Sequence, residues 1–217
     1  MTSRMLALVG LALAPGAMPA RAEDALAPTS LSVGFGGHAA IYEDTPFGRQ
    51  LRDAGYGFNG FEPSFTVTVL HALTGWLKVG GELHLRASSE ARDANSAGVT
   101  GSRWAASETG LTQVTARALV QFAMVIPDDG GETGLEMGVQ LGIGAGPTWW
   151  WLRDATETAA HLDLSAAMIW NVRATRHFGF GLRILHSGLF QEGLGPRDLG
   201  FGPTWSPTAE LRLEYAW

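Results

Sequence analysis

The sequence predicts an all-β protein, an eight-stranded antiparallel, up-and-down transmembrane β-barrel. The first observation is a period of two, because hydrophobic and polar residues alternate from Leu31 to the end of the chain. The second is length, since segments of about ten residues are what a tilted strand needs to cross a bilayer. The third is that the links between these segments are alternately short and long.

The composition is short of charge and rich in glycine. Of the 217 residues, 46% are hydrophobic, 17% are charged and 29 are glycine, whereas about 25% of the residues in an average soluble domain are charged. A chain without cysteine can form neither a disulfide scaffold nor a thiolate metal site. The net charge of −6 argues against nucleic acid as a partner. The sequence indicates no metal and no cofactor.

The first 22 residues have the pattern of a secretory signal peptide. Arg4 precedes an apolar run over residues 5–14, and Ala20-Arg21-Ala22 is a small-x-small cleavage site. The run is too short for a transmembrane helix, which needs about 20 apolar residues. We therefore expect an exported protein, with a signal peptide over 1–22 and one barrel domain over 23–217.

Eight segments show the alternation, and each has an apolar and a polar face. Segment 77–87 is the clearest, because Lys78, Glu82 and Arg86 all fall on its polar face. The apolar faces of the first four segments are Leu31, Val33 and Phe35; Phe65, Val67 and Val69; Leu77, Val79, Gly81, Leu83, Leu85 and Ala87; and Val114, Ala116, Ala118, Val120, Phe122, Met124 and Ile126. Those of the last four are Leu135, Met137, Val139, Leu141 and Ile143; Leu162, Leu164, Ala166, Met168, Trp170 and Val172; Phe178, Phe180, Leu182 and Ile184; and Ala209, Leu211, Leu213, Tyr215 and Trp217.

The links between the segments predict which ends of the strands lie together. The predicted short links are 74–75, 127–131 and 174–176, and the predicted long links are 43–62, 88–110, 147–160 and 188–207. Short turns on the periplasmic side and long loops outside are typical of bacterial outer-membrane barrels. A hairpin within the first or second long link would raise the strand number to ten.

The charged residues of these segments fall on one face and are nearly balanced in sign. We predict that they form a paired network in the lumen, because an eight-stranded barrel is filled by side chains and a buried charge is costly without a partner. Glycines on the same face leave room beside the arginines, and a narrow pore for small solutes is the alternative. The predicted network is Lys78, Glu82, Arg86, Arg117, Glu136, Asp163, Arg173, Arg183, Glu210, Arg212 and Glu214.

Two solvent assignments fit alternating strands, and the bilayer is favoured. A soluble barrel would turn its apolar face inward, and its outer face would carry more mixed charge than this glycine-rich face does. Aromatic residues cluster at strand ends, as the interfacial girdle of a membrane barrel requires. The predicted girdle is Trp76, Trp149, Trp150, Trp151, Tyr215 and Trp217.

The final strand carries a resemblance to a known family. Leu211, Leu213, Tyr215 and Trp217 alternate up to the last residue, and this pattern resembles the terminal strand of Gram-negative outer-membrane β-barrels. With the signal peptide and eight strands, the chain resembles the small barrels of the OmpA/OmpX type. The resemblance implies an integral protein of the bacterial outer membrane, whose terminal strand is the signal that the barrel-assembly machinery reads.

One pair of residues suggests an enzyme. Lipid A deacylases of the outer membrane use a His-x-Ser pair on the lipid-facing side of a small barrel, and His186 is on the apolar parity of its segment. Ser187 is the adjacent residue and should point the other way, and position 188 is a glycine. Glu192 could supply an acid. A lipid A-modifying hydrolase is therefore the third hypothesis.

The favoured function is non-catalytic. We expect a structural or surface-interaction protein, a monomer whose loops contact outer-membrane lipid, lipopolysaccharide or external partners. Loop arginines would meet lipopolysaccharide phosphates, and loop acids would meet the divalent cations that bridge them.

Overall fold

Strands make up nearly all of the chain that the structure describes. The structure is a computed structural model, and it describes residues 29–38, 56–58, 62–88, 91–93, 110–128, 133–152, 155–191 and 202–217. The strands are β1 (Thr29–His38), β2 (Tyr56–Phe58), β3 (Glu62–Ala72), β4 (Leu77–Ser88), β5 (Ala91–Asp93), β6 (Gly110–Pro127), β7 (Gly134–Leu152), β8 (Ala155–Arg173), β9 (Phe178–Gln191) and β10 (Gly202–Ala216). No helix within these ranges is long and apolar enough to span a membrane. The predicted signal peptide lies outside them.

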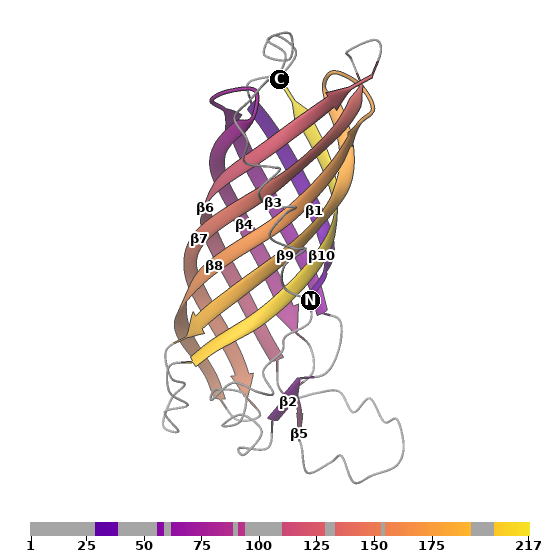
Figure 1. Cartoon of the computed structure of the whole chain (residues 1–217). Coiled ribbons are helices and arrows are strands. Elements are labelled where there is room, and N and C mark those ends of the chain that lie inside the picture. The colour runs from indigo at the N-terminus through magenta and orange to yellow at the C-terminus, as the bar shows by residue number, and fades with distance from the viewer. Residues whose placement is uncertain are drawn as a thin grey trace, which may run out of the picture.

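Eight of the strands close into one antiparallel barrel. The order around it is β1-β10-β9-β8-β7-β6-β4-β3, and β1 pairs with both β10 and β3. The other two strands, β2 and β5, pair with each other beyond one end of the barrel (Figure 1). The predicted fold class is confirmed. The question of ten strands is also answered, because the two additional strands are not part of the barrel wall.

The strands are staggered around the barrel, which tilts them against its axis. The direct partner of Ser32 on β10 is Glu214. Partners traced the other way, through β3, β4, β6, β7, β8 and β9, lead from Ser32 to Thr204 on β10, ten residues from Glu214. Closing a sheet requires such a stagger and a strand tilt of about 35–45°. The oblique strands in Figure 1 show this tilt.

Side chains alternate strictly between the lumen and the outer wall. On the outer wall Leu83, Leu141 and Ile143 are 51%, 47% and 62% exposed, whereas Arg117 and Glu136 in the lumen are 4% and 0% exposed. The period-two pattern of the sequence is therefore realised with its apolar face outward. Not every inward residue is polar, since Leu119, Ile169, Leu185 and Leu189 are also buried inside.

The two ends of the barrel differ in their connections. At one end, which we call the turn end, lie residues 73–76 and 174–177 together with Asp128, Thr133, Thr29 and Trp217. Two turns there have the same hydrogen-bonding pattern. Thr74 Oγ1 accepts from the amides of Trp76 and Leu77, and Thr175 Oγ1 accepts from the amides of the equivalent two residues. The opposite end is called the loop end.

The predicted links at the loop end were wrong in extent. Residues 147–160 were expected to form a long loop, but β7 continues to Leu152 and β8 begins at Ala155, and these two residues are paired. Likewise β9 runs to Gln191 and β10 begins at Gly202, inside the predicted link 188–207. Tryptophan and threonine favour strands, so residues 149–152 and 155–158 extend the ladder although their sequence lacks the alternation used to set the bounds.

Candidate functional site

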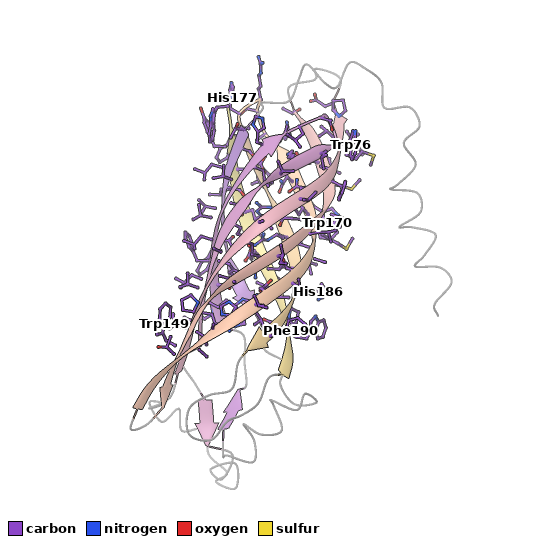
Figure 2. The ribbon with its side chains drawn as sticks, turned by 90° about the vertical axis from the view of Figure 1, so that its left-hand side faces the viewer. Trp76, Trp149, Trp170, His177, His186 and Phe190 are labelled. Carbon is purple, nitrogen blue, oxygen red and sulfur yellow. The ribbon has the colours of Figure 1, made fainter. Side chains whose placement is uncertain are left out.

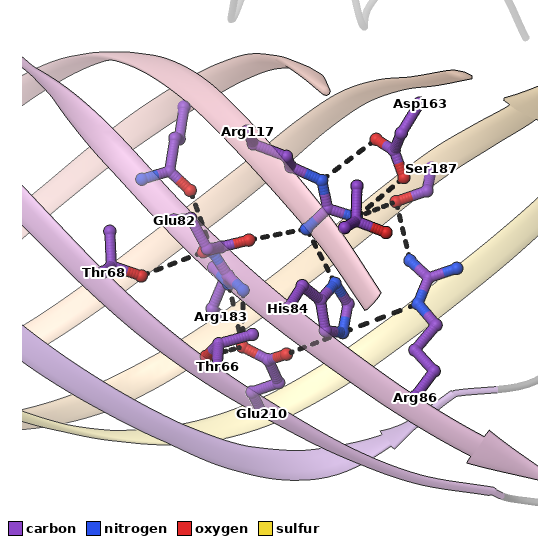
Figure 3. A network of polar contacts seen from close by, with 12 residues as sticks. Thr66, Thr68, Glu82, His84, Arg86, Arg117, Asp163, Arg183, Ser187 and Glu210 are labelled. Atoms are coloured by element: carbon purple, nitrogen blue, oxygen red, sulfur yellow. Dashed lines mark hydrogen bonds and ion pairs between the residues drawn. The ribbon is translucent and has the colours of Figure 1, made fainter. Parts of the chain in front are cut away.

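The centre of the lumen is built around Arg117. It lies on β6, and its Nε and Nη2 donate to the two carboxylate oxygens of Asp163 on β8, at 3.0 and 2.7 Å. Its Nη1 reaches Glu82 Oε1 on β4 at 2.5 Å and donates to His84 Nδ1 at 2.7 Å (Figure 3). A bidentate arginine-carboxylate pair is among the strongest hydrogen-bonded contacts in proteins. Arg117 therefore joins β4, β6 and β8 across the lumen.

A second arginine carries the network to the remaining wall. Arg183 on β9 donates to Glu82 Oε2 and, through Nε, to Glu210 Oε2 at 2.9 Å. Its Nη1 also donates to Gln140 Oε1 at 3.0 Å. Each of these two carboxylates also accepts a hydrogen bond from a threonine hydroxyl. Thr68 donates to Glu82 at 2.9 Å, and Thr66 donates to Glu210 at 3.2 Å.

A separate group of charges lies nearer the turn end. Glu136 accepts from Lys78 Nζ and from Arg173 Nη2, each at 2.6 Å. Gln121 Nε2 donates to the same carboxylate at 2.9 Å. Glu136 is fully buried, so two cations and one amide replace the water that its carboxylate loses.

The structure places all eleven predicted charges inward, and three of them contact hydroxyl or amide groups in the described part of the chain. Arg212 donates to the Ser32 hydroxyl, and Glu214 accepts from Asn171 Nδ2 at 3.1 Å. Arg86 donates to Ser187 Oγ at 2.9 Å. The Arg212 contact joins the adjacent strands β10 and β1, whereas the other two contacts join strands that are not adjacent, β8 with β10 and β4 with β9.

A polar ladder near the loop end was missed by the reasoning from sequence. His161 Nε2 contacts Thr115 Oγ1 at 2.8 Å, and its Nδ1 contacts Thr148 Oγ1 at 2.9 Å. Gln113 donates to the same Thr148 hydroxyl at 3.1 Å. These residues could have been predicted to face the lumen. Each lies an even number of residues from a predicted lumen charge on the same strand, so its side chain points to the same side.

The lumen as described is a filled interior. The central carboxylates and guanidinium groups contact partners on opposite walls, and Glu136, Asp163 and Arg183 are 0% exposed. Such an interior cross-links the strands through hydrogen-bonded pairs of charged groups.

The His186 and Ser187 side chains lie on opposite sides of the wall. His186 is exposed on the outer wall and stacks on Trp205, with ring centroids 5.4 Å apart and planes 7° from parallel. Ser187 is buried in the lumen, where Arg86 and Arg117 donate to it at 2.9 and 3.2 Å. The two therefore form no nucleophile-base pair. Glu192 lies outside the described residues.

Aromatic side chains lie at both ends of the outer wall. Trp76, Tyr215 and Trp217 are about half exposed at the turn end, and Trp149 lies toward the loop end (Figure 2). Trp150 and Trp151 are in β7, but their side chains lie outside the description. Trp76 stacks on Phe122 and Tyr215 on Trp217, with ring centroids 6.0 and 6.1 Å apart.

The last strand closes the barrel. Its alternating residues Leu211, Leu213, Tyr215 and Trp217 all lie on the outer wall, where each is at least 52% exposed. Trp217 and Thr29 exchange both backbone hydrogen bonds, N to O, at 2.9 and 3.2 Å. The predicted assembly signal is therefore an outward-facing ridge beside the closing seam.

No protein-family model and no curated protein matches the chain. Solved structures that resemble it include the following three. Neisserial surface protein A is 7% identical, with a TM-score of 0.51, over 87% of this chain and 96% of that one. The attachment invasion locus protein Ail of Yersinia pestis is 14% identical, with a TM-score of 0.46, over 88% and 99%. The N-terminal β-barrel domain of Pseudomonas aeruginosa OprF is 12% identical, with a TM-score of 0.45, over 87% and 97%.

At 7% identity, the likeness to Neisserial surface protein A concerns the fold alone. It agrees with the closed eight-stranded sheet. The class of protein is thus defined by architecture: an all-β, eight-stranded antiparallel barrel with the fold of the small outer-membrane barrels.

Proposed function

We propose that this chain is an integral, non-catalytic protein of the bacterial outer membrane, with a structural or surface-interaction role carried by its loop end. The observation that carries the proposal is the reversed burial: apolar side chains cover the outer wall, and charged side chains fill the interior. In water this arrangement would expose a large continuous apolar surface, which soluble monomers avoid. Against hydrocarbon the same surface is the favourable one.

The dimensions of the apolar surface support this assignment. On β8 it runs from Val172 to Leu162, both exposed and ten residues apart. At about 3.4 Å per residue and a tilt of about 40°, this segment spans roughly 25 Å along the barrel axis. That height is close to the apolar band of outer-membrane barrels, which is about 25 Å tall.

The test of membrane residence uses the folded protein without detergent. We expect the chain to insert into phospholipid vesicles, to stay with them at alkaline pH, and to migrate on gels at different positions before and after boiling. Without lipid or detergent it should aggregate. A protein that stays dissolved and monomeric in buffer alone would show that the apolar wall does not require a membrane.

The non-conducting role is tested in planar bilayers. Because the lumen centre is cross-linked by Arg117 and Arg183, we expect little or no ion conduction, with a general porin measured in the same membranes as the positive control. A stable open channel of porin size would favour transport instead. Catalysis is tested by lipid A mass spectra from cells with and without the gene, and we expect the same acylation pattern in both.

The orientation is tested with single cysteines, since the chain has none of its own. Ser96→Cys, in the long link between β5 and β6, should react with an impermeant thiol reagent added to intact cells. Thr175→Cys, in a short turn, should react only after the envelope is opened. The opposite labelling pattern would place the loop end in the periplasm.

The partners belong to the same proposal. We infer that the chain is a monomer that contacts lipopolysaccharide at its loop end and the barrel-assembly machinery through its last strand. Trp217→Ala should slow assembly in cells, whereas Trp76→Ala, an exposed tryptophan at the same end but outside that strand, should not. Equal assembly of the two variants would contradict a role for the terminal ridge.

A further inference from the structure

Three of the six histidines are exposed, and they lie at different depths along the barrel. His71 and His177 adjoin the short turns at the turn end. His186 instead lies within β9, on the outer wall, where it pairs with Ala166 on β8 (Figure 2). Ala166 is four residues from Leu162, the loop-end limit of the apolar surface on β8, so His186 lies roughly 10 Å inside the apolar band.

The imidazole of His186 has no hydrogen bond within the described part of the chain. Its contact there is the parallel stack on Trp205, with ring centroids 5.4 Å apart. A stack occupies the face of a ring, so the two ring nitrogens, which lie in the ring plane, remain able to hydrogen-bond. A polar group in hydrocarbon is costly without a partner, and an ionisable side chain at membrane depth indicates a functional site.

Trp205 and short side chains define how another molecule can approach this imidazole. Trp205 is opposite Gly188, which is two residues nearer to the loop end than His186, so the stack directs the imidazole toward the edge of the apolar band. Ala166 and Pro207, which pair with His186, have short side chains. A Cβ at Gly188 would meet no atom closer than 3.8 Å. The pair is therefore accessible from the lipid side.

The surface around the pair is apolar and exposed. Leu164 and Met168 on β8 are 52% and 54% exposed, and Trp205 is 47% exposed with an indole N–H that has no hydrogen bond among the described residues. An occupant that matches this surface needs an apolar chain and, at one end of it, an oxygen that accepts hydrogen bonds. A lipid has both, because its acyl chains end in ester carbonyls at the boundary between the hydrocarbon and the headgroups.

We propose that His186 and Trp205 bind the ester region of one lipid in the outer leaflet. The imidazole and indole N–H groups donate to the acyl ester carbonyls, and the acyl chain lies over Leu164 and Met168. Polar side chains near the edge of a membrane extend their polar atoms toward that edge in the same way. The site binds without cleaving, since Gly188 supplies no nucleophile on this face. This inference rests on the membrane location and orientation proposed above.

The first test exchanges the ester for an ether. The chain and His186→Leu are unfolded with urea in vesicles of a diacyl phosphatidylcholine and of the dialkyl ether lipid with the same chains, which lacks the carbonyl oxygens. We expect His186→Leu to raise the unfolding equilibrium constant about three- to tenfold more in the ester lipid, because only there is a hydrogen bond lost. Met168→Leu, an exposed apolar neighbour, should have equal effects in the two lipids.

The outcomes of this test separate the site from the proposed location. An equal effect of His186→Leu in the two lipids would overturn the site and leave the membrane location standing. A chain that enters neither kind of vesicle would overturn both.

The second test identifies the partner without reference to stability. Histidine rings labelled with nitrogen-15 are placed in the same ester lipid labelled with carbon-13 at its carbonyls, and solid-state magnetic resonance measures the dipolar coupling between the two nuclei. We expect a coupling to His186 that is absent in His186→Leu and weakened in Trp205→Leu, because the stacked ring holds the imidazole in place. His84, buried in the lumen, is the internal control and should show none. A His186 ring coupled to water alone, or to no carbonyl, would mean that the site binds no lipid.

Discussion

The inner and outer walls of this barrel are built by the same strands, yet they obey opposite rules. On the outer wall Leu141 and its neighbours are apolar side chains that remain largely exposed, so their hydrophobicity matters more than their packing. On the inner wall each charged group has assigned partners on other strands, as Arg183 has in Glu82 and Glu210. At an outer position the bilayer requires only that the residue be apolar. At an inner position the partners on other strands require one particular residue.

The largest expected effect comes from breaking the inner network at its centre. Arg183→Ala leaves the buried carboxylates of Glu82 and Glu210 without their shared cation, and we expect a loss of about 3–5 kcal/mol in the free energy of unfolding. Urea unfolding in vesicles measures it. Arg173→Ala, in a side chain that is 13% exposed at the lumen edge, should cost less. Equal losses would mean that burial does not set the cost.

The next effect concerns charge on the outer wall. Leu141→Arg, in the middle of the apolar band, should cost about 2–4 kcal/mol, because an arginine there must leave water for hydrocarbon. Leu73→Arg, in a turn at the band edge, should cost about 0–1 kcal/mol. The same vesicle unfolding measurement compares them. If both variants lost the same free energy of unfolding, the bilayer would not explain the apolar outer wall.

Substitution of a glycine should also have different effects on the inner and outer walls, although these effects are smaller. A Cβ at Gly142 would lie 2.6 Å from Ser165 Oγ and 2.8 Å from a Leu119 methyl group, so Gly142→Val should cost about 1–3 kcal/mol by overpacking. At Gly81 the only neighbour of a Cβ is the Arg117 carbonyl oxygen at 3.4 Å. Gly81→Val should be neutral or stabilising, and the thermal stability of both variants reports the difference.

The smallest effect lies outside both walls, in the turns. Thr74→Ala removes the hydroxyl that accepts from the Trp76 and Leu77 amides, and Thr175→Ala removes its counterpart. Each change should cost about 0.5–1.5 kcal/mol, the usual net value of a hydrogen bond. Similar losses in the two variants are expected because the turns share one geometry. A Thr→Ser change at either position keeps the hydroxyl and serves as the control.

Much of the architecture was predictable from the sequence because a strand places alternate residues on opposite faces. The parity of residues 77–87 was enough to separate Leu83 from Glu82, and the structure places these two side chains outside and inside. The strand bounds at the loop end were not predictable by the same rule. The ladder of β7 and β8 continues to Leu152 and Ala155 through residues whose sequence does not alternate, because backbone pairing does not itself require alternation.

The sequence by itself determined the fold class, the face that each barrel strand presents and the set of charged residues that lie inside, whereas the choice between eight and ten strands was left to the structure. It could do so because face and parity are local properties of an extended chain. Only the tertiary structure decided which charges are partners, such as Arg117 with Asp163 rather than with Glu136. The physical reason is the ten-residue stagger, which sets the residues that meet across the lumen and which no single strand encodes.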